Sequence, residues 1–451
     1  MKKNLLLLFF CSCMSLCVYA QWYTIGADVD EYVIGFGTYK DTIVAYAFGT
    51  PYLLRQTGAT WENWEVPIPN SNGVHSIAVV DDVLFVVPYS TTNTAYVYYW
   101  ENGAWKTLGE SFKNVNSINP PNLYDIIFHD GHLYVCGEFN RIGNEIVNGV
   151  ARWDITHWSP LGTGISEIMS PHNVVYPHDL TIFNNELIVC GNFVRAGDID
   201  VNGIAAWNGN SWHGFGQGFN QAAYGAEVHE GILYACGEFT NTANNDVVLG
   251  RVAKWNADEG WQYPGFKVAP TPNENFCYAH TLRSLNNHLY ILGGFDAVED
   301  DFNSYPGGGV ARWNGQTIDA LYGGVTNPSD AEAIYPYQGG MLVGGDFSMA
   351  GNTAVNGIAF LYDDATTSAP PFATSLVPLQ RPFAYYNGSL HWNESSKVMR
   401  FSITDLNGKQ VMAGDIELEN PISLVHLPVG IYFVQTFVDN EMPSMDRIIC
   451  Q

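Results

Sequence analysis

The amino-acid sequence predicts an all-β protein assembled from copies of one four-stranded unit, and two observations lead to this prediction. The segment Leu133–Phe139 (LYVCGEF) recurs almost unchanged at 187–193 and 233–239, and in more divergent form at 289–295 and 341–347. Charged residues make up 14% of the chain and hydrophobic residues 47%, whereas an ordinary globular domain carries about 25% charged residues. This composition, with 45 glycines, suits short buried strands joined by tight turns, and it excludes a disordered chain.

The first residues have the pattern of an export signal. Lys2 and Lys3 precede an apolar run from Leu5 to Val18, and Ala20 supplies a small residue at the expected cleavage position. Residues 1–20 are therefore predicted to be a signal peptide. The run is too short for a membrane-spanning helix, and no other segment reaches about 18 continuous apolar residues. We therefore expect no transmembrane segment.

The charge of the chain argues against a nucleic-acid partner. Lys and Arg number 19 against 45 Asp and Glu, which gives a formal net charge of −26. Such a chain has no basic surface that could neutralise phosphates. By the same argument, anionic lipid head groups would repel it.

Each anchor segment is followed by a second signature that defines the rest of the unit. Asn148–Trp153 (NGVARW) returns in related form at 202–207, 250–255, 309–313 and 356–361, and weaker anchors lie at 43–48 and 84–89. Seven anchors predict seven units of four short strands, because apolar alternation is bounded by turns rich in Gly, Asn and Asp. One four-stranded sheet cannot bury both faces alone, so we expect a seven-bladed β-propeller over residues 21–363.

The repeated tryptophans are predicted to fill the gaps between neighbouring sheets. Large flat side chains suit the widening space between radial blades, and we prefer this structural role to stacking on a sugar. The tryptophans assigned to it are Trp22, Trp100, Trp105, Trp153, Trp158, Trp207, Trp212, Trp255 and Trp313.

The two ends of the repeat region complement each other. The last unit lacks the Trp-x-x-apolar-Gly pattern of a fourth strand after Leu361, and Trp22–Gly26 has the same pattern as Trp158–Gly162. We therefore expect the mature N-terminal strand to complete the last blade. The ring would then close without an exposed sheet edge.

The units resemble the Kelch-related propeller repeats of secreted bacterial proteins, with the pattern G-x-F-x-x-A-G…N-x-I-A-x-W-x-G-x-x-W-x-x-L-G-x-G. Similar repeats occur in Rax2-like fungal cell-polarity markers and in galactose-oxidase-like propellers. The resemblance covers residues 21–363 and implies a mostly non-catalytic binding scaffold. It carries over no catalytic residue, and the tandem Tyr-His pair of the copper-radical oxidases is missing.

A separate module follows the repeats. Residues 364–382 are rich in Pro and predict a linker, and residues 383–451, with a turn at Asn407-Gly408, predict a small β-sandwich. The segments Ile403–Val411 (ITDLNGKQV) and Ile422–Val434 (ISLVHLPVGIYFV) resemble the type A sorting domain of the type IX secretion system of Bacteroidota. The resemblance implies a partner, the type IX machinery. It also implies passage through the periplasm and outer membrane of a Gram-negative bacterium, to the medium or the cell surface.

One column of polar residues stands nine positions before each anchor from the second unit onward. Its members are His75, Tyr124, His178, Tyr224, His280 and Glu332. In Kelch-like propellers this strand is innermost, so the resemblance places the six residues around the central channel. Three interpretations stay open: packing of a narrow channel, binding of a polar ligand, or a metal-binding collar.

Signals for a cofactor or for catalysis are weak. Asp296, Glu299, Asp300 and Asp301 lie in one predicted loop and form a weak candidate for a structural calcium, against the alternative of a solvated loop. No other cofactor is expected. Neither a G-x-S-x-G elbow nor an H-E-x-x-H motif occurs.

Taken together, these features predict an exported binding or adhesion protein whose ligand is a glycan or a protein. We expect a monomer, and binding rather than catalysis. A propeller hydrolase or lyase that acts on polysaccharide is the alternative, because its carboxylates could lie in loops. A purely structural component without a ligand pocket is the third possibility.

Overall fold

The structure is a computed structural model. It describes residues 21–25, 32–49, 53–57, 60–64, 66–115, 117, 119–169, 175–270, 277–326, 330–362, 383–386, 389–392, 400–405, 410–415, 422–424, 426–427, 430–437 and 444–450. The chain divides into two compact units, Met1–Thr374 and Ser375–Gln451, which are described separately. The predicted signal peptide (1–20) and linker (364–382) lie outside the described residues.

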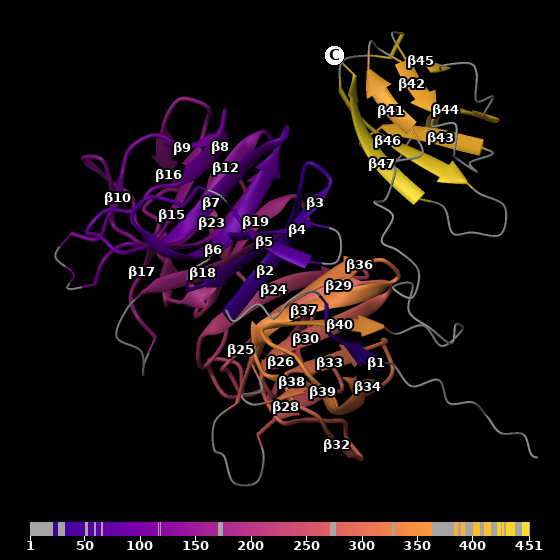
Figure 1. Cartoon of the computed structure of the whole chain (residues 1–451). Coiled ribbons are helices and arrows are strands. Elements are labelled where there is room, and N and C mark those ends of the chain that lie inside the picture. The colour runs from indigo at the N-terminus through magenta and orange to yellow at the C-terminus, as the bar shows by residue number, and fades with distance from the viewer. Residues whose placement is uncertain are drawn as a thin grey trace, which may run out of the picture. The chain divides into compact units, whose positions relative to one another are not determined.

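Nearly all regular structure in the first unit is β-sheet, which confirms the all-β prediction (Figure 1). Over the described residues, the helical structure is limited to one 3-10 turn, η1 (Leu321–Gly323). No helix in the described part of the chain is long and apolar enough to span a membrane.

Seven four-stranded antiparallel sheets follow one another along the described part of this unit. The first three are β2 (Tyr32–Tyr39), β3 (Thr42–Phe48), β4 (Leu53–Thr57), β5 (Thr60–Asn63); β6 (Ser71–Val80), β7 (Val83–Ser90), β8 (Tyr98–Glu101), β9 (Ala104–Thr107); and β11 (Asn122–His129), β12 (His132–Glu138), β15 (Val150–Trp153), β16 (Trp158–Pro160). The fourth and fifth are β18 (Tyr176–Phe183), β19 (Glu186–Asn192), β22 (Ile204–Trp207), β23 (Trp212–Gly214); and β24 (Ala223–His229), β25 (Ile232–Gly237), β26 (Val252–Asn256), β27 (Gly260–Gln262). The last two are β29 (Tyr278–Leu285), β30 (His288–Gly294), β33 (Val310–Trp313), β34 (Ile318–Ala320); and β36 (Asp330–Tyr337), β37 (Gly340–Asp346), β40 (Ile358–Tyr362), β1 (Gln21–Tyr23). Single residue pairs, Phe48 with Gly73 and Gly294 with Asp330, additionally join the first sheet to the second and the sixth to the seventh.

The same two-residue turn joins the first and second strands of every one of these sheets. Both turn residues have positive φ in each case, as a tight turn between right-twisted strands requires. Asn, Asp and Gly supply most of these positions because they tolerate that conformation well. The turns are Lys40-Asp41, Asp81-Asp82, Asp130-Gly131, Asn184-Asn185, Glu230-Gly231, Asn286-Asn287 and Gln338-Gly339.

Strand β1 joins the two ends of the unit. It pairs antiparallel with β40, with Trp22 opposite Leu361. This is the position at which the tryptophan pattern of the sequence predicts it. The Trp22 side chain is 6% exposed and packs with Met341 in the core of the last two sheets.

The hydrophobic core consists of separate clusters between neighbouring sheets. Val33 and Ala45 of the first sheet, for example, pack with Phe360 of the seventh. Such a cluster lies between each pair of consecutive sheets and also between the first and the seventh. The first unit is therefore propeller-like, because each sheet buries its two faces against two neighbours.

Tryptophans of the repeat connect neighbouring sheets by hydrogen bonds as well as by packing. The indole N–H of Trp158 donates to the carbonyl of Leu108 (2.9 Å), just beyond the fourth strand of the preceding sheet. Trp212 and Trp261 repeat this contact with Leu161 (2.8 Å) and Phe215 (3.0 Å). The tryptophans of the third strands lie opposite those of the fourth strands, in the pairs Trp100–Trp105, Trp153–Trp158, Trp207–Trp212 and Trp255–Trp261.

Four three-stranded sheets that the sequence did not predict lie at the connections between the larger ones. Each pairs a connecting strand with a hairpin from the next large sheet. They are β10 (Phe112–Lys113), β13 (Arg141–Ile142), β14 (Glu145–Ile146); β17 (Ile165–Ser166), β20 (Arg195–Ala196), β21 (Ile199–Asp200); β28 (Lys267–Ala269), β31 (Ala297–Glu299), β32 (Ser304–Pro306); and β35 (Val325–Thr326), β38 (Met349–Ala350), β39 (Thr353–Ala354).

The second unit contains two antiparallel sheets in its described residues. One has the order β41 (Phe383–Tyr386), β42 (Ser389–Trp392), β45 (Ile422–Ser423), and the other β44 (Gln410–Asp415), β43 (Arg400–Asp405), β46 (Gly430–Phe437), β47 (Ser444–Cys450). β43 and β44 are the two strands that flank the predicted turn at Asn407-Gly408. The turn itself lies outside the described residues.

Candidate functional site: the central cavity

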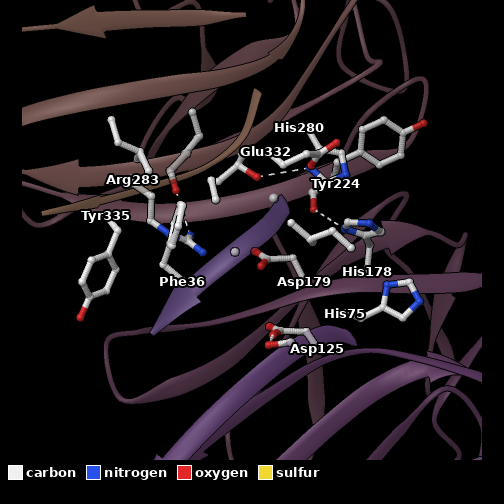
Figure 2. A pocket seen from close by; sticks show the side chains of 18 of the residues that line it. Phe36, His75, Asp125, His178, Asp179, Tyr224, His280, Arg283, Glu332 and Tyr335 are labelled. Carbon is white, nitrogen blue, oxygen red and sulfur yellow. Dashed lines mark hydrogen bonds and ion pairs between the residues drawn. The ribbon is translucent and has the colours of Figure 1, made fainter. Parts of the chain in front are cut away.

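The six residues of the predicted polar column line one cavity of the first unit (Figure 2). The cavity has a volume of about 340 Å³, and the first strand of each of the seven sheets contributes to its wall. In the first sheet Ile34 occupies the place that His75 or Tyr124 occupies in its own sheet. We refer to Ile34 and the six predicted residues as the channel ring.

Each residue of the channel ring is the extra residue of a β-bulge. In the third sheet Leu123 pairs with Gly137 and Asp125 with Cys136, so Tyr124 has no partner in the ladder. The same shift occurs in the other six sheets. A bulge changes the direction of the side chains around it. Both the ring residue and the residue after it consequently reach the cavity.

In the third to seventh sheets, the glycine of the anchor segment makes room for this bulge. A Cβ atom on Gly191 would lie 2.3 Å from the carbonyl oxygen of Tyr176 in the first strand. The equivalent distance is between 2.1 and 2.4 Å for Gly137, Gly237, Gly293 and Gly345. Ala47 and Pro88 take this place in the first two sheets, which is why their anchors are hard to recognise in the sequence.

The aromatic members of the ring pack against one another around the cavity. Ring centroids of consecutive members are 5.0 to 5.7 Å apart from His75 through Tyr124, His178 and Tyr224 to His280. The hydroxyl groups of Tyr124 and Tyr224 donate to Glu138 (2.6 Å) and Glu238 (2.5 Å). The ring is therefore a preorganised wall, fixed from behind by carboxylates.

The three histidines of the ring differ in charge. Burial lowers the pKa of His75 to about 3 and that of His178 to about 4, so both are neutral at pH 7. Nδ1 of His178 donates to the carbonyl of Tyr224 at 2.9 Å. Burial also acts against the charged form of His280, but the charge of Glu332, whose Oε2 lies 2.5 Å from Nδ1, raises its pKa overall.

A second layer of charged residues, which the sequence did not reveal, lies next to the ring. Oδ1 of Asp125 accepts hydrogen bonds from the Ser76 hydroxyl (2.6 Å) and from its neighbour's amide, Ile126 N (2.8 Å), and Oδ2 accepts one from Leu180 N (3.0 Å). Asp125 thus links the second, third and fourth sheets. The protein itself thus takes up three acceptor positions of this carboxylate.

Asp179 and Arg283 are less fully occupied. Oδ2 of Asp179 accepts a hydrogen bond from Ala226 N (2.9 Å) in the fifth sheet, and Asp179 belongs to the lining of the cavity. Burial, and then the charge of Asp125, raise the pKa of Asp179 to about 7. Nη1 of Arg283 donates to Leu282 O (3.0 Å) and lies 3.6 Å from Glu227, and 46% of the side chain is exposed.

The cavity has an aromatic edge. Phe36 and Tyr335 belong to its lining, and their ring centroids are 6.2 Å apart. Figure 2 shows both side chains on the same side of the cavity as Arg283. The hydroxyl groups of Thr38 and Tyr335 form a hydrogen bond that orients the tyrosine. An apolar surface thus lies beside the charged groups.

Within the described part of the chain, no group of three or more His, Cys, Asp or Glu side chains is arranged to hold a metal ion. The acidic residues of the calcium candidate lie on and next to the hairpin of β31 and β32. Glu299 pairs with Lys267 at 2.8 Å, and Oδ1 of Asp300 accepts the amides of Phe302 (2.8 Å) and Asn303 (2.7 Å). These carboxylates are used within the loop, as in an ordinary Asx turn.

Buried neutral histidines predict a loss of stability in acid. The unfolded chain binds protons below about pH 6.5 while His75 and His178 in the fold do not, so the free energy of unfolding falls as the pH drops from 6.5 towards 4. The double variant His75→Gln, His178→Gln should lose this slope, on the order of 6 kcal/mol over the range, in urea unfolding at several pH values.

The raised pKa of Asp179 has the opposite effect on stability, but Asp179 is present in both proteins and its effect cancels in the comparison. His157→Gln, at a surface histidine whose side chain is 57% exposed, is the control and should keep the wild-type slope. Equal slopes for the wild type and the double variant would contradict the assignment of the two histidines as neutral.

Comparison with known proteins gives no family for this chain. No protein-family model and no curated protein matches it. Among solved structures it is similar to a computationally designed protein, Ika8 (13% identity, TM-score 0.41, 76% of this chain and 99% of that one). It is also similar to the extracellular domain of BT3049 from B. thetaiotaomicron (14%, 0.43, 92% of this chain and 52% of that one) and to YCF48 from Cyanidioschyzon merolae (9%, 0.44, 76% and 98%).

Proposed function

We propose that this chain is an exported seven-bladed β-propeller, closed by β1, that binds the end of a glycan in its central cavity. Strand pairing and packing support this architecture. Each of the seven four-stranded sheets shares a hydrophobic cluster with the next sheet along the chain, and the first sheet also packs against the seventh. The sorting-domain resemblance of the second unit supports delivery to the cell surface or the medium by the type IX machinery.

One observation carries the binding proposal: seven strands converge on a single cavity that contains hydrogen-bonding groups with unused capacity. A few convergent polar groups beside apolar side chains are typical of small-molecule sites. The volume of about 340 Å³ lies at the small end of such sites, which span roughly 300 to 1,000 Å³. It therefore suits the end of a chain rather than the surface of a folded protein, and it favours binding over a purely structural role.

The hydrolase alternative also has an observation in its favour. Asp125 and Asp179 line the same cavity, and the raised pKa of Asp179 is a property of general acids. Against this, Asp125 is held by three hydrogen bonds from the protein. We therefore place binding first, and a reducing-sugar assay on each bound glycan separates the two functions.

A tryptophan placed in the channel ring tests the binding site. Ile34→Trp fills the cavity from the first sheet and should lower the signal of the mature full-length protein on a glycan array at least about tenfold, since a ligand and an indole cannot share so small a space. Ile146→Trp is the matched control, because Ile146 is 61% exposed on β14 and outside the cavity. Unchanged glycan binding by Ile34→Trp would place the site elsewhere.

A further inference from the structure

Two groups of opposite charge keep unused hydrogen-bonding capacity towards the cavity. Within the part of the chain that the structure describes, Oδ1 of Asp179 accepts no hydrogen bond, and Nη2 and Nε of Arg283 donate none. They come from β18 and β29, on the fourth and sixth sheets. Each charge affects the pKa of the other, and Figure 2 shows both groups extending into the same space.

The balance of charge around these groups disfavours a charged ligand. An anion at Arg283 would face Glu227, Asp179 and Asp125 as well. A cation at Asp179 would face the guanidinium of Arg283. His280 is balanced by Glu332, and His75 and His178 are neutral at pH 7. The cavity therefore disfavours an anion, and it offers both donors and acceptors to a neutral molecule.

A pair of adjacent hydroxyl groups satisfies both sites at once. A hydroxyl is one donor and two acceptors, so one group can accept from the guanidinium while its neighbour donates to the carboxylate. Hydrogen bonds from the guanidinium, which stays ionised, are about twice as strong as neutral ones.

The aromatic edge of the cavity narrows the class of ligand further. Phe36 and Tyr335 lie beside Arg283 in the lining, where they offer an apolar surface to the C–H face of a sugar ring. An open-chain polyol has the hydroxyls but no such face. We infer that the cavity recognises a neutral pyranose at the end of a glycan, with two adjacent hydroxyls held between Asp179 and Arg283. The inference rests on the proposed function, since it names the ligand class of the same cavity.

Calorimetric titration of the mature full-length protein with monosaccharides tests this ligand class. The probes are galactose, mannose, glucosamine, glucuronate and the open-chain polyol sorbitol. At least one of the two neutral hexoses should bind about tenfold or more tighter than the charged sugars and sorbitol. Tighter binding of glucosamine or glucuronate would overturn the inference. It would leave the proposed function intact, because a glycan would still occupy the cavity.

Variants of the two side chains test the geometry. Asp179→Asn keeps an oxygen for Ala226 N but presents an amide donor to the sugar, and Arg283→Lys keeps the charge without the planar fork. Each should weaken binding of the neutral hexose about tenfold. The double variant should be little weaker than either single one, because both side chains hold the same pair of hydroxyls.

Matched controls come from a surface hairpin. Arg195→Lys and Asp198→Asn change the same residue types near β20 and β21, outside the cavity, and should leave binding unchanged. Thermal unfolding verifies that the two cavity variants fold. If both cavity variants bind the neutral sugar as tightly as the wild type and Ile34→Trp does not bind it, the diol geometry is refuted. The location of the site in the cavity would still be supported. Binding that Ile34→Trp leaves unchanged refutes the proposed site itself.

Discussion

Removal of residues 21–25 is expected to destabilise the first unit by on the order of 5 kcal/mol. Trp22 is 6% exposed and packs with Met341 in the cluster of the last two sheets. Loss of a buried aromatic side chain alone costs about 3 to 5 kcal/mol. The deletion also removes the ladder between β1 and β40 and leaves β40 as an unpaired edge. Urea unfolding followed by tryptophan fluorescence measures the change.

A point variant distinguishes the contribution of the β1 backbone pairing from that of the Trp22 side chain. Trp22→Ala retains the backbone pairing and should lose about 3 to 5 kcal/mol. Phe302→Ala is the matched control, because Phe302 is 91% exposed and surface substitutions usually change stability by no more than about 0.5 kcal/mol. A deletion that leaves the urea midpoint unchanged would contradict the role of β1 in completing the seventh sheet.

The second large effect is expected at the anchor glycines. In Gly191→Ala the new methyl group would lie 2.3 Å from Tyr176 O and 2.6 Å from the Cα atom of Pro177. Both atoms belong to backbone, so the clash cannot be relieved by a side-chain rotation. We expect a loss of at least about 3 kcal/mol, at the upper end of overpacking. The ligand affinity of the cavity should fall as well, because His178 follows Pro177 in the bulge.

A second glycine isolates the steric part of this effect. Gly131 lies in the tight turn between β11 and β12, has a φ of +79°, and would meet no atom within 4 Å of an added Cβ. Gly131→Ala therefore costs only the strain of a left-handed conformation, about 1 to 2 kcal/mol. Equal losses in the two variants would contradict the steric role assigned to Gly191.

The repeat made the strands and the channel ring predictable. Each large sheet uses the same spacing between the ring position and the anchor, so a count of nine residues finds His75 and Glu332 equally well. The same count from the weak anchor at Ile43 leads to Ile34, which the sequence prediction left out. Its apolar side chain gave no reason to include it, and Ala47 in place of the glycine hides the anchor.

Asp125 and Asp179 could not be predicted from the same pattern. In a regular strand, adjacent residues point to opposite faces, so a neighbour of a ring residue is expected to face away from the cavity. The bulge breaks this alternation, and it leaves no trace in the spacing because every unit contains it. Arg283 was missed for another reason. It stands three residues beyond His280, and no other sheet has an arginine at that position.

The strands of the seventh sheet come from both ends of the repeat region. This also fixes the order in which the first unit can assemble. Trp22 pairs opposite Leu361, so a residue that precedes the first sheet in the chain must wait for one of the last residues of the repeats. Contacts between such distant residues form late, because the loop that they close is long. The first six sheets can pack as they emerge, while the seventh stays three-stranded until β1 returns. Protease resistance of the whole unit should therefore appear in one final step, after the chain is complete.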